Sequence, residues 1–255
     1  MYYKQKNIIT GGNSTMSEKS FVATQDNKVV TYQGISLGKE NASTDFNKIC
    51  VSGFIEEEFE YSHEFLREKF YKTRIRVARL SGTEDYIPII VSELLMPIAI
   101  ESGLKGKYVK AEGQLRSYKK VGKDGRKHLE LFLFARNIKV YEIGEEFEYA
   151  LPIENLIYLD GRICRRSTSR TTPLGRQITD FVIAVGRPHN KVDYIPCIAW
   201  GRAAQYVSKL EVGDWIKLYG RVQSREYLKR LLDSEDVEAR TTYEVSIIRI
   251  TKMEG

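Results

Sequence analysis

The pattern of apolar and polar residues is clearest in the second half of the chain, where it predicts strands. Five segments have the length and alternation of strands, and they lie at 156–164, 178–187, 193–200, 215–227 and 241–250. Between the third and the fourth of them, residues 202–210 place Ala203, Val207 and Leu210 on one side of a short helix. The pattern therefore predicts three strands, one helix and two further strands.

The first half of the chain repeats the landmarks of the second half in the same order. The corresponding landmarks are Asn47 and Asn155, Gly53 and Gly161, the quartets Asp-Tyr-Ile-Pro at 85–88 and 193–196, and the segments 113–117 and 220–224. Each copy is interpreted as five strands with one short helix, which is the element order of the OB-fold, a Greek-key barrel. We expect an all-β protein with two tandem OB-folds.

These landmarks divide the chain into four parts. Residues 1–46 are polar and contain a glycine-rich cluster, so we expect a flexible N-terminal arm with at most a short strand near 28–32. The first OB-fold domain spans 47–142 and the second spans 154–255. The linker at 143–153 is short, so we expect it to hold the two domains at a restricted angle.

The predicted fourth strand of the second copy has two different faces. One face suits a barrel interior and consists of Ile216, Leu218, Gly220, Val222 and Ser224. The other face interleaves aromatic rings with positive charge and consists of Trp215, Lys217, Tyr219, Arg221, Gln223, Arg225 and Tyr227. Bases stack on rings and phosphates pair with Lys and Arg, so this pattern is typical of single-strand binding. An ordinary solvated strand face is the alternative.

A group of arginines lies between the first and second predicted strands of the same copy. It contains Arg165, Arg166, Arg170 and Arg176 among Ser, Thr and Gly. We expect a loop here, and the corresponding loop of an OB-fold flanks the binding face. Phosphate binding and a plain solvated loop are the two interpretations of this segment.

The second copy resembles the bacterial single-stranded DNA-binding protein family. The similar segments cover nearly the whole copy and lie at 155–162, 172–175, 181–185, 193–201 and 220–227. Members of this family stack bases on aromatic residues of the third strand and near the end of the fourth. The resemblance therefore implies stacking on Tyr194, Trp200 and Tyr227, with a buried core ring as the alternative for Trp200.

The strand pattern and the resemblance together define a candidate site for single-stranded DNA. The stacking candidates are Tyr194, Trp200, Tyr227, Tyr219, Tyr86 and Tyr118. The phosphate-binding candidates are Arg165, Arg166, Arg170, Arg187, Lys217, Arg221 and Arg225.

The first copy departs from the pattern of the second. Four glutamates within 56–60, which we interpret as a solvated run, stand where the second copy has arginines. Ser92 and Lys120 stand where the second copy has stacking aromatics, whereas Tyr86 and Tyr118 remain beside a basic hairpin. The first copy is therefore expected either to bind DNA weakly or mainly to pack against its neighbours.

Composition and charge narrow the possible functions. The formal net charge of +6 and the pI near 9.0 favour a polyanionic partner. The three cysteines lie apart in predicted strands, without a Cys-x-x-Cys pair, so neither a zinc knuckle nor a disulfide framework is expected. Three scattered histidines, no phosphate-binding loop and no nucleophile–base pair predict no catalytic residue, cofactor or metal. No apolar stretch reaches the length of a membrane span, so we expect a cytoplasmic protein.

The leading hypothesis is a protein, not an enzyme, that binds and protects single-stranded DNA during replication, recombination or repair. The alternative is an OB-fold scaffold of a primosome-like or replisome assembly in which DNA contact is secondary. The family usually ends in an acidic tail that recruits partners, and here the last predicted strand is followed only by 251–255, so replication or recombination proteins are expected to bind by another route. The resemblance also implies four OB domains around one DNA strand, hence a homodimer; a monomer whose copies pair with each other is the alternative.

Overall fold

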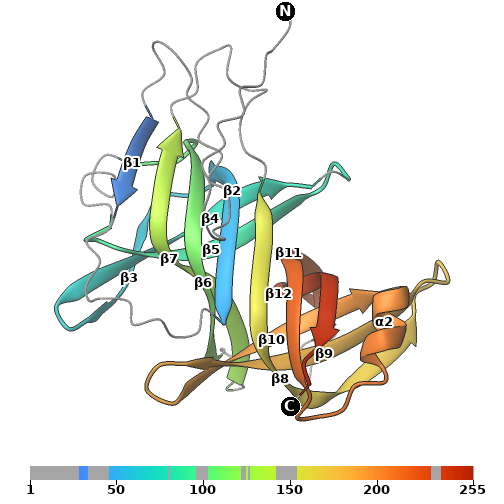
Figure 1. The fold of residues 1–255 in the computed structure, drawn as a ribbon. Coiled ribbons are helices and arrows are strands. Elements are labelled where there is room, and N and C mark those ends of the chain that lie inside the picture. The colour runs from blue at the N-terminus through green and yellow to red at the C-terminus, as the bar shows by residue number, and fades with distance from the viewer. Residues whose placement is uncertain are drawn as a thin grey trace, which may run out of the picture.

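The structure is a computed structural model that describes residues 29–33, 46–79, 81–95, 103–121, 125, 127–141, 154–230 and 237–254. The first copy contributes β2 (Asn47–Ile55), β3 (Glu60–Phe65), β4 (Glu68–Ala78), β5 (Glu84–Ser92), β6 (Tyr108–Val121) and β7 (Lys127–Tyr141). The second contributes β8 (Asn155–Thr171), β9 (Gln177–Arg187), β10 (Lys191–Trp200), α2 (Arg202–Val207), β11 (Trp215–Arg230) and β12 (Val237–Lys252). Figure 1 shows the strands of each copy curving into a separate barrel.

The strands of the second copy close into a barrel in the order β8–β9–β10–β12–β11–β8. Neighbours are antiparallel except β10 and β12, which pair in parallel at Cys197↔Val245. Side chains that alternate inward, such as Ile183, Ile195 and Leu218, are fully buried. Helix α2 buries Ala204 and Val207 beside β9 and β10. The predicted five strands and single helix are therefore confirmed, and every strand extends one or more residues beyond its predicted bounds.

The first copy forms the same barrel, in the order β2–β4–β5–β7–β6–β2, with β5 and β7 parallel. Its first strand is interrupted, because β3 forms a separate hairpin with β4 where the second copy has the continuous β8. The helix predicted for this copy falls between β5 and β6, where 96–102 lie outside the described residues. Two tandem OB-folds are confirmed as the fold class.

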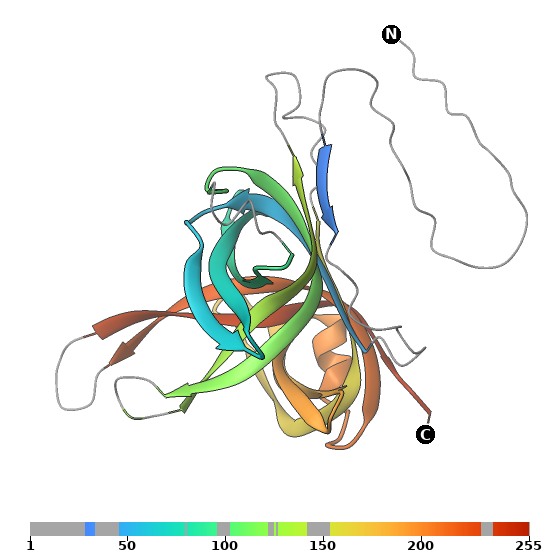
Figure 2. The ribbon, with the colours of Figure 1, turned by 90° about the vertical axis from the view of Figure 1, so that its left-hand side faces the viewer.

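A short strand, β1 (Val29–Gln33), precedes the first barrel and pairs with β7 (Figure 2). It confirms the strand expected near 28–32. The rest of the predicted N-terminal arm, apart from Phe46, lies outside the described residues, as does all of the predicted linker.

The arginine-rich segment of the second copy is a strand, not the predicted loop. Strand β8 continues to Thr171 and pairs with β9 as far as Thr171↔Gln177, which leaves only a tight turn at 172–176. Two register irregularities, between Ile163 and Thr168, accompany this long hairpin. Such bulges insert unpaired residues and disturb the strict apolar–polar alternation on which the prediction relied.

The two barrels are related by an approximate two-fold axis through their first strands. Strands β2 and β8 lie side by side in Figure 1 and pair antiparallel around Ile49↔Ile157, which occupy the same position in the two copies. Flanking bonds repeat the symmetry, because the N–H of Ser52 donates to the Glu154 carbonyl and the N–H of Asp160 to the Phe46 carbonyl, each at 2.8 Å. One continuous sheet therefore joins the copies.

The landmarks of the repeat stabilise this arrangement. Within each barrel, the amide of Asn155 bonds the backbone of Val222, as the amide of Asn47 bonds that of Leu115. A Cβ on Gly161 would lie 2.4 Å from the carbonyl oxygen of Ala184, so only glycine allows the close strand approach there. The repeated motif is therefore largely a structural one.

Reciprocal contacts join the copies at two seams. Buried Asp85 of the first copy accepts bonds from Ser224 of the second, and buried Asp193 of the second accepts bonds from Ser117 of the first. Asp85 also pairs with Arg79, which follows β4, and Asp193 pairs with Arg187, which ends β9. Buried carboxylates need such partners, so the aspartate of each quartet serves the interface between the copies.

Candidate nucleic-acid interface

The two faces predicted for β11 are present in the structure. Ile216, Leu218 and Val222 point into the barrel and are at most 1 % exposed. The opposite face is divided between two surroundings, because residues 215–220 pair with β8 whereas the later part of the strand pairs with β12 alone. The aromatic and basic residues of this strand therefore do not form a single uniform surface.

The first half of the β11 outer face is internally paired. The Nε1–H of Trp215 donates to Asp160, and the Nζ of Lys217 lies 3.8 Å from the same carboxylate. The rings of Tyr219 and Tyr158 have centroids 5.0 Å apart, and burial together with Asp160 raises the pKa of Tyr158 to about 12. Tyr219 keeps 44 % of its surface exposed. This half offers a tyrosine ring, while Asp160 offsets the charge of Lys217.

The second half of the face opens into a pocket of about 830 Å³. Its lining residues are Arg79, Gly175, Arg176, Gln177, Trp200, Gly201, Arg221, Gln223 and Ser246. Trp200 is 39 % exposed, which rules out the alternative of a buried core ring. The pocket thus combines an accessible indole with three guanidinium groups. Arg221 and Arg176 belong to segments that the sequence indicates as phosphate-binding, whereas Arg79 was not predicted.

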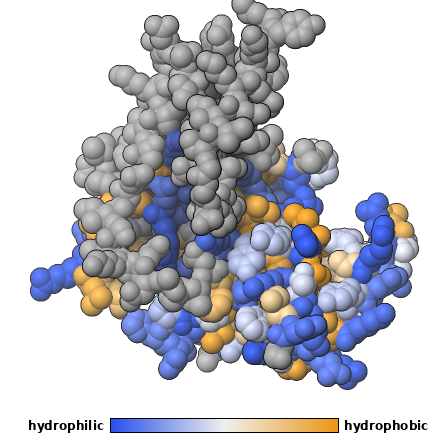
Figure 3. Space-filling view, viewed as in Figure 1, coloured by the Kyte–Doolittle hydropathy of each residue, from blue (hydrophilic) through white to orange (hydrophobic). Residues whose placement is uncertain are grey.

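The remaining basic candidates of the second copy lie on exposed strand positions. Arg165 and Arg166 are exposed on β8, and the Nε of Arg170 donates to Asp180 at 2.9 Å. Arg225 is half exposed and lies 4.0 Å from Glu244. Figure 3 shows mainly hydrophilic side chains at the end of the second barrel that faces away from the first. These cations extend the positive surface beyond the pocket.

Several candidates lie apart from the pocket, at the seam where Asp193 bonds Ser117. Tyr194 and Tyr118 are each 42 % exposed, and the N–H of Tyr194 donates to Ser117 Oγ at 2.8 Å, so β10 and β6 meet there. Arg187 lies 3.4 Å from buried Asp193 and is a quarter exposed. The backbone of Tyr227 pairs with Arg240, but its side chain lies outside the described residues.

On the first copy, the face formed by β4 and the acidic segment is neutralised by ion pairs. Arg74 donates to Glu57 with two nitrogens, which lowers the pKa of Glu57. Arg76 bonds a second glutamate of the run at 3.0 Å and Glu84 at 2.7 Å, and the hydroxyl of Tyr86 donates to Glu84 as well. The acidic segment is therefore largely paired with β4 rather than simply solvated.

The second copy has small or apolar residues at the positions of these arginines. Val182 and Ala184 occupy on β9 the places of Arg74 and Arg76 on β4, as the register against the third strand of each barrel shows. The two copies therefore present different surfaces from the same part of the fold. One has paired charges, and the other has small or apolar positions flanked by exposed cations and rings.

A model of the single-strand binding protein family matches residues 154–253. The second copy is therefore similar to the single-strand binding protein family over nearly its whole length. The single-stranded DNA-binding proteins of Oceanobacillus iheyensis and Clostridium tetani are 29 % and 36 % identical over 101 and 83 residues, which are 37 % and 29 % of this chain. The matched parts amount to 58 % and 55 % of those relatives, so the chain spans a little over half their length.

Solved structures of this family extend the similarity to both copies. The wild-type single-stranded DNA binding protein from Thermus aquaticus superimposes with a TM-score of 0.62 at 19 % identity, over 82 % of this chain and 93 % of that one. A deletion variant of the same protein gives 0.63 at 18 % identity, with 82 % and 95 % covered. At this level of identity the similarity establishes the fold, a pair of OB barrels in the arrangement of the single-strand binding protein from Thermus.

The described residues contain neither a candidate metal site nor a candidate membrane span. No group of three or more His, Cys, Asp or Glu side chains there could hold a metal ion. No helix in that part of the chain is long and apolar enough to cross a membrane.

Proposed function

We propose that this chain binds single-stranded DNA over the outer face of its second barrel, without catalysing a reaction. The observation that carries the proposal is the pocket in which exposed Trp200 lies beside Arg176 and Arg221. A base stacks on the indole while the guanidinium groups pair with the flanking phosphates. Stacking on an aromatic ring contributes about 1–3 kcal/mol per base and needs no particular sequence.

The neighbouring side chains suggest the direction of the strand. Tyr219 offers a second exposed ring on β11, and Tyr194, at the seam away from the pocket, offers another on β10. Exposed Arg165 and Arg166 extend the cationic surface along β8. We propose that the strand follows these residues. Lys217, whose charge is offset by Asp160, and Arg187, which does not line the pocket, contribute less.

The experiment compares the affinity of single-stranded DNA, duplex DNA and single-stranded RNA for the protein. Trp200→Ala should weaken binding of single-stranded DNA by about 5- to 150-fold, which corresponds to 1–3 kcal/mol. Tyr206→Ala is the matched control, because Tyr206 is equally exposed but lies on α2 and does not line the pocket. Equal affinity for duplex DNA, or equal effects of the two substitutions, would contradict the proposal.

A second candidate function is an interaction scaffold, and the β3–β4 hairpin favours it. Tyr61, Phe65 and Leu66 are 57, 62 and 84 % exposed on this hairpin, which also carries acidic side chains. Exposed aromatic and aliphatic side chains of this kind are common in protein interfaces. If the protein is a scaffold, its affinity for single-stranded DNA should not exceed its affinity for duplex DNA. The same titration therefore distinguishes the two candidate functions.

We further propose that the protein acts in the cytoplasm, during replication, recombination or repair, as a homodimer with four OB barrels. The first-strand edges already pair with each other inside one chain, so a dimer must use other surfaces. Replication or recombination proteins would bind by such surfaces too. Light scattering should give about twice the 29.4 kDa of one chain, and the mass of a single chain with and without DNA would rule the dimer out.

A further inference from the structure

The pocket beside Trp200 contains one side chain from the first barrel. Arg79 follows β4 and lines the pocket together with residues of the second barrel. A turn fixes its backbone, because the N–H of Arg79 donates to the Thr83 carbonyl at 2.8 Å and the N–H of Gly82 donates to the Arg79 carbonyl at 3.0 Å. The φ of Gly82 is +81°, a value that favours glycine. The first copy thus brings a cation to the surface of the second.

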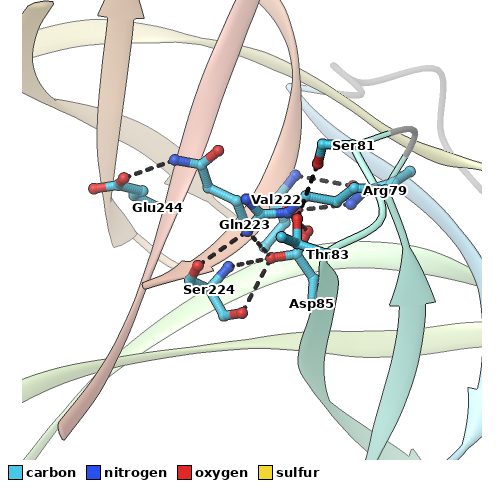
Figure 4. Close-up of polar contacts among 9 residues, drawn as sticks. Arg79, Ser81, Thr83, Asp85, Val222, Gln223, Ser224 and Glu244 are labelled. Carbon is cyan, nitrogen blue, oxygen red and sulfur yellow. Dashed lines mark hydrogen bonds and ion pairs between the residues drawn. The ribbon is translucent and has the colours of Figure 1, made fainter. Parts of the chain in front are cut away.

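A buried carboxylate holds the guanidinium of Arg79 in place (Figure 4). Its Nε donates to Asp85 Oδ2 at 2.6 Å, and its Nη2 donates both to Asp85 Oδ1 and to the Ser224 carbonyl. Asp85 in turn accepts from the N–H and the hydroxyl of Ser224 at 2.6 and 3.0 Å. These bonds use Nε and Nη2, so the two Nη1 protons take no part in them. A side chain already held in this way loses little further freedom when it binds an anion.

Positive charge exceeds negative charge around this position. Arg79, Arg176 and Arg221 line the pocket, and the neighbouring carboxylates are those of Asp85 and Glu244. Glu244 is itself bonded by Gln223 at 2.8 Å and lies 4.0 Å from the guanidinium of Arg225. Among the described residues, four guanidinium groups and two carboxylates thus lie in or beside the pocket, and a phosphate group would reduce the imbalance.

We propose that Arg79 binds a phosphate of the strand whose base stacks on Trp200, and that Asp85 is the positioning residue for Arg79. The first barrel then takes part in DNA binding through this side chain, although ion pairs neutralise its own face. This inference rests on the proposed function. At the other seam the equivalent arginine, Arg187, pairs with Asp193 but does not line the pocket, so the contact belongs to one seam only.

The test is the salt dependence of single-stranded DNA binding for Arg79→Gln. Each phosphate contact contributes about 0.7 to the slope of log affinity against log salt concentration, so the slope should become shallower by about that amount. Arg76→Gln is the matched control, because it removes the same charge from a position near the end of β4, close in sequence to Arg79. Arg76 pairs with two glutamates, so its loss should leave the slope unchanged. Arg79→Lys keeps the charge and should restore the slope. Thermal unfolding of each variant verifies that the fold is retained.

The outcomes separate this inference from the proposed function. Equal flattening by Arg79→Gln and Arg76→Gln would mean that net charge alone is responsible, and would overturn the inference. If Trp200→Ala weakens binding while Arg79→Gln leaves the slope unchanged, the inference fails and the proposed function stands. If Trp200→Ala has no effect, the proposed function fails. Should Arg79→Gln not fold, Arg79→Met replaces it, because methionine keeps an apolar stem and removes the charge, and an unchanged slope for that variant would overturn the inference.

Discussion

Replacing Asp193 by Asn should strongly destabilise the contact between the two barrels. The carboxylate is fully buried and accepts the N–H of Ser117 at 2.7 Å and the Nη1 of Arg116 at 3.1 Å, while Arg187 lies 3.4 Å away. Asparagine keeps an oxygen for Ser117 but removes the charge that balances the two guanidinium groups. Arg116 is only 14 % exposed, and burial already lowers its pKa, so its charge is poorly solvated without Asp193.

Removing one partner of a buried ion pair costs about 3–5 kcal/mol. At an m-value of about 2 kcal/mol per molar urea, Asp193→Asn should lower the unfolding midpoint by about 1.5–2.5 M. Asp180→Asn is the control, because Asp180 forms a half-exposed pair with Arg170 and such pairs contribute at most about 1 kcal/mol. Urea titrations followed by circular dichroism measure both. Equal losses for the two variants would refute the reasoning, since burial would then make no difference.

Two further predictions concern the strand contacts and the thiols. Gly161→Ala should cost about 1–3 kcal/mol in a urea titration, because its Cβ would lie 2.4 Å from a backbone oxygen, whereas Gly186→Ala, with open space around it, should be nearly neutral. Burial raises the pKa of all three thiols, those of Cys50, Cys164 and Cys197, so the reactive thiolate is scarce. A chromogenic disulfide reagent at pH 8 should therefore react slowly with the native protein and rapidly with all three thiols in urea; fast labelling of the native protein would contradict this.

The second barrel could be predicted from sequence because local pattern and tertiary structure agree there. Strict alternation on β11 separates buried Leu218 and Val222 from exposed Tyr219, and the spacing of Ala203 and Val207 matches the buried face of α2. In this barrel the prediction of a loop was wrong for the arginine-rich part of β8, which is a strand with two register irregularities. Extra residues there break the apolar–polar alternation. Without the alternation, only the polar composition of this segment could be used, and that composition predicts a loop.

Contacts between the copies could not be predicted, because they join residues far apart in the sequence. The Asp-Tyr-Ile-Pro quartets were recognisable as a repeat, yet nothing local indicates that Asp85 meets Ser224, 139 positions later. The same holds for Arg79, which lies next to a turn in the first barrel and lines a pocket of the second. A repeat does carry one usable signal: a buried acidic residue that recurs with a partner arginine at the same position in both copies marks a shared structural contact.

The two barrels share the same framework and have different surfaces. The repeat has the same residue types at the positions where an asparagine amide bonds the backbone within each barrel and where an aspartate bonds a serine of the other barrel. Both barrels need these contacts, as does the sheet that joins them. The outer faces carry no such requirement. On β4 the arginines are matched by glutamates of the same barrel, and on β9 the equivalent residues are Val182 and Ala184. A surface whose charges are already satisfied gains little from a phosphate, since the existing ion pairs must first be broken. The barrel with exposed cations and an exposed indole is therefore the one suited to bind the strand, and the other barrel contributes Arg79, which lines the same pocket.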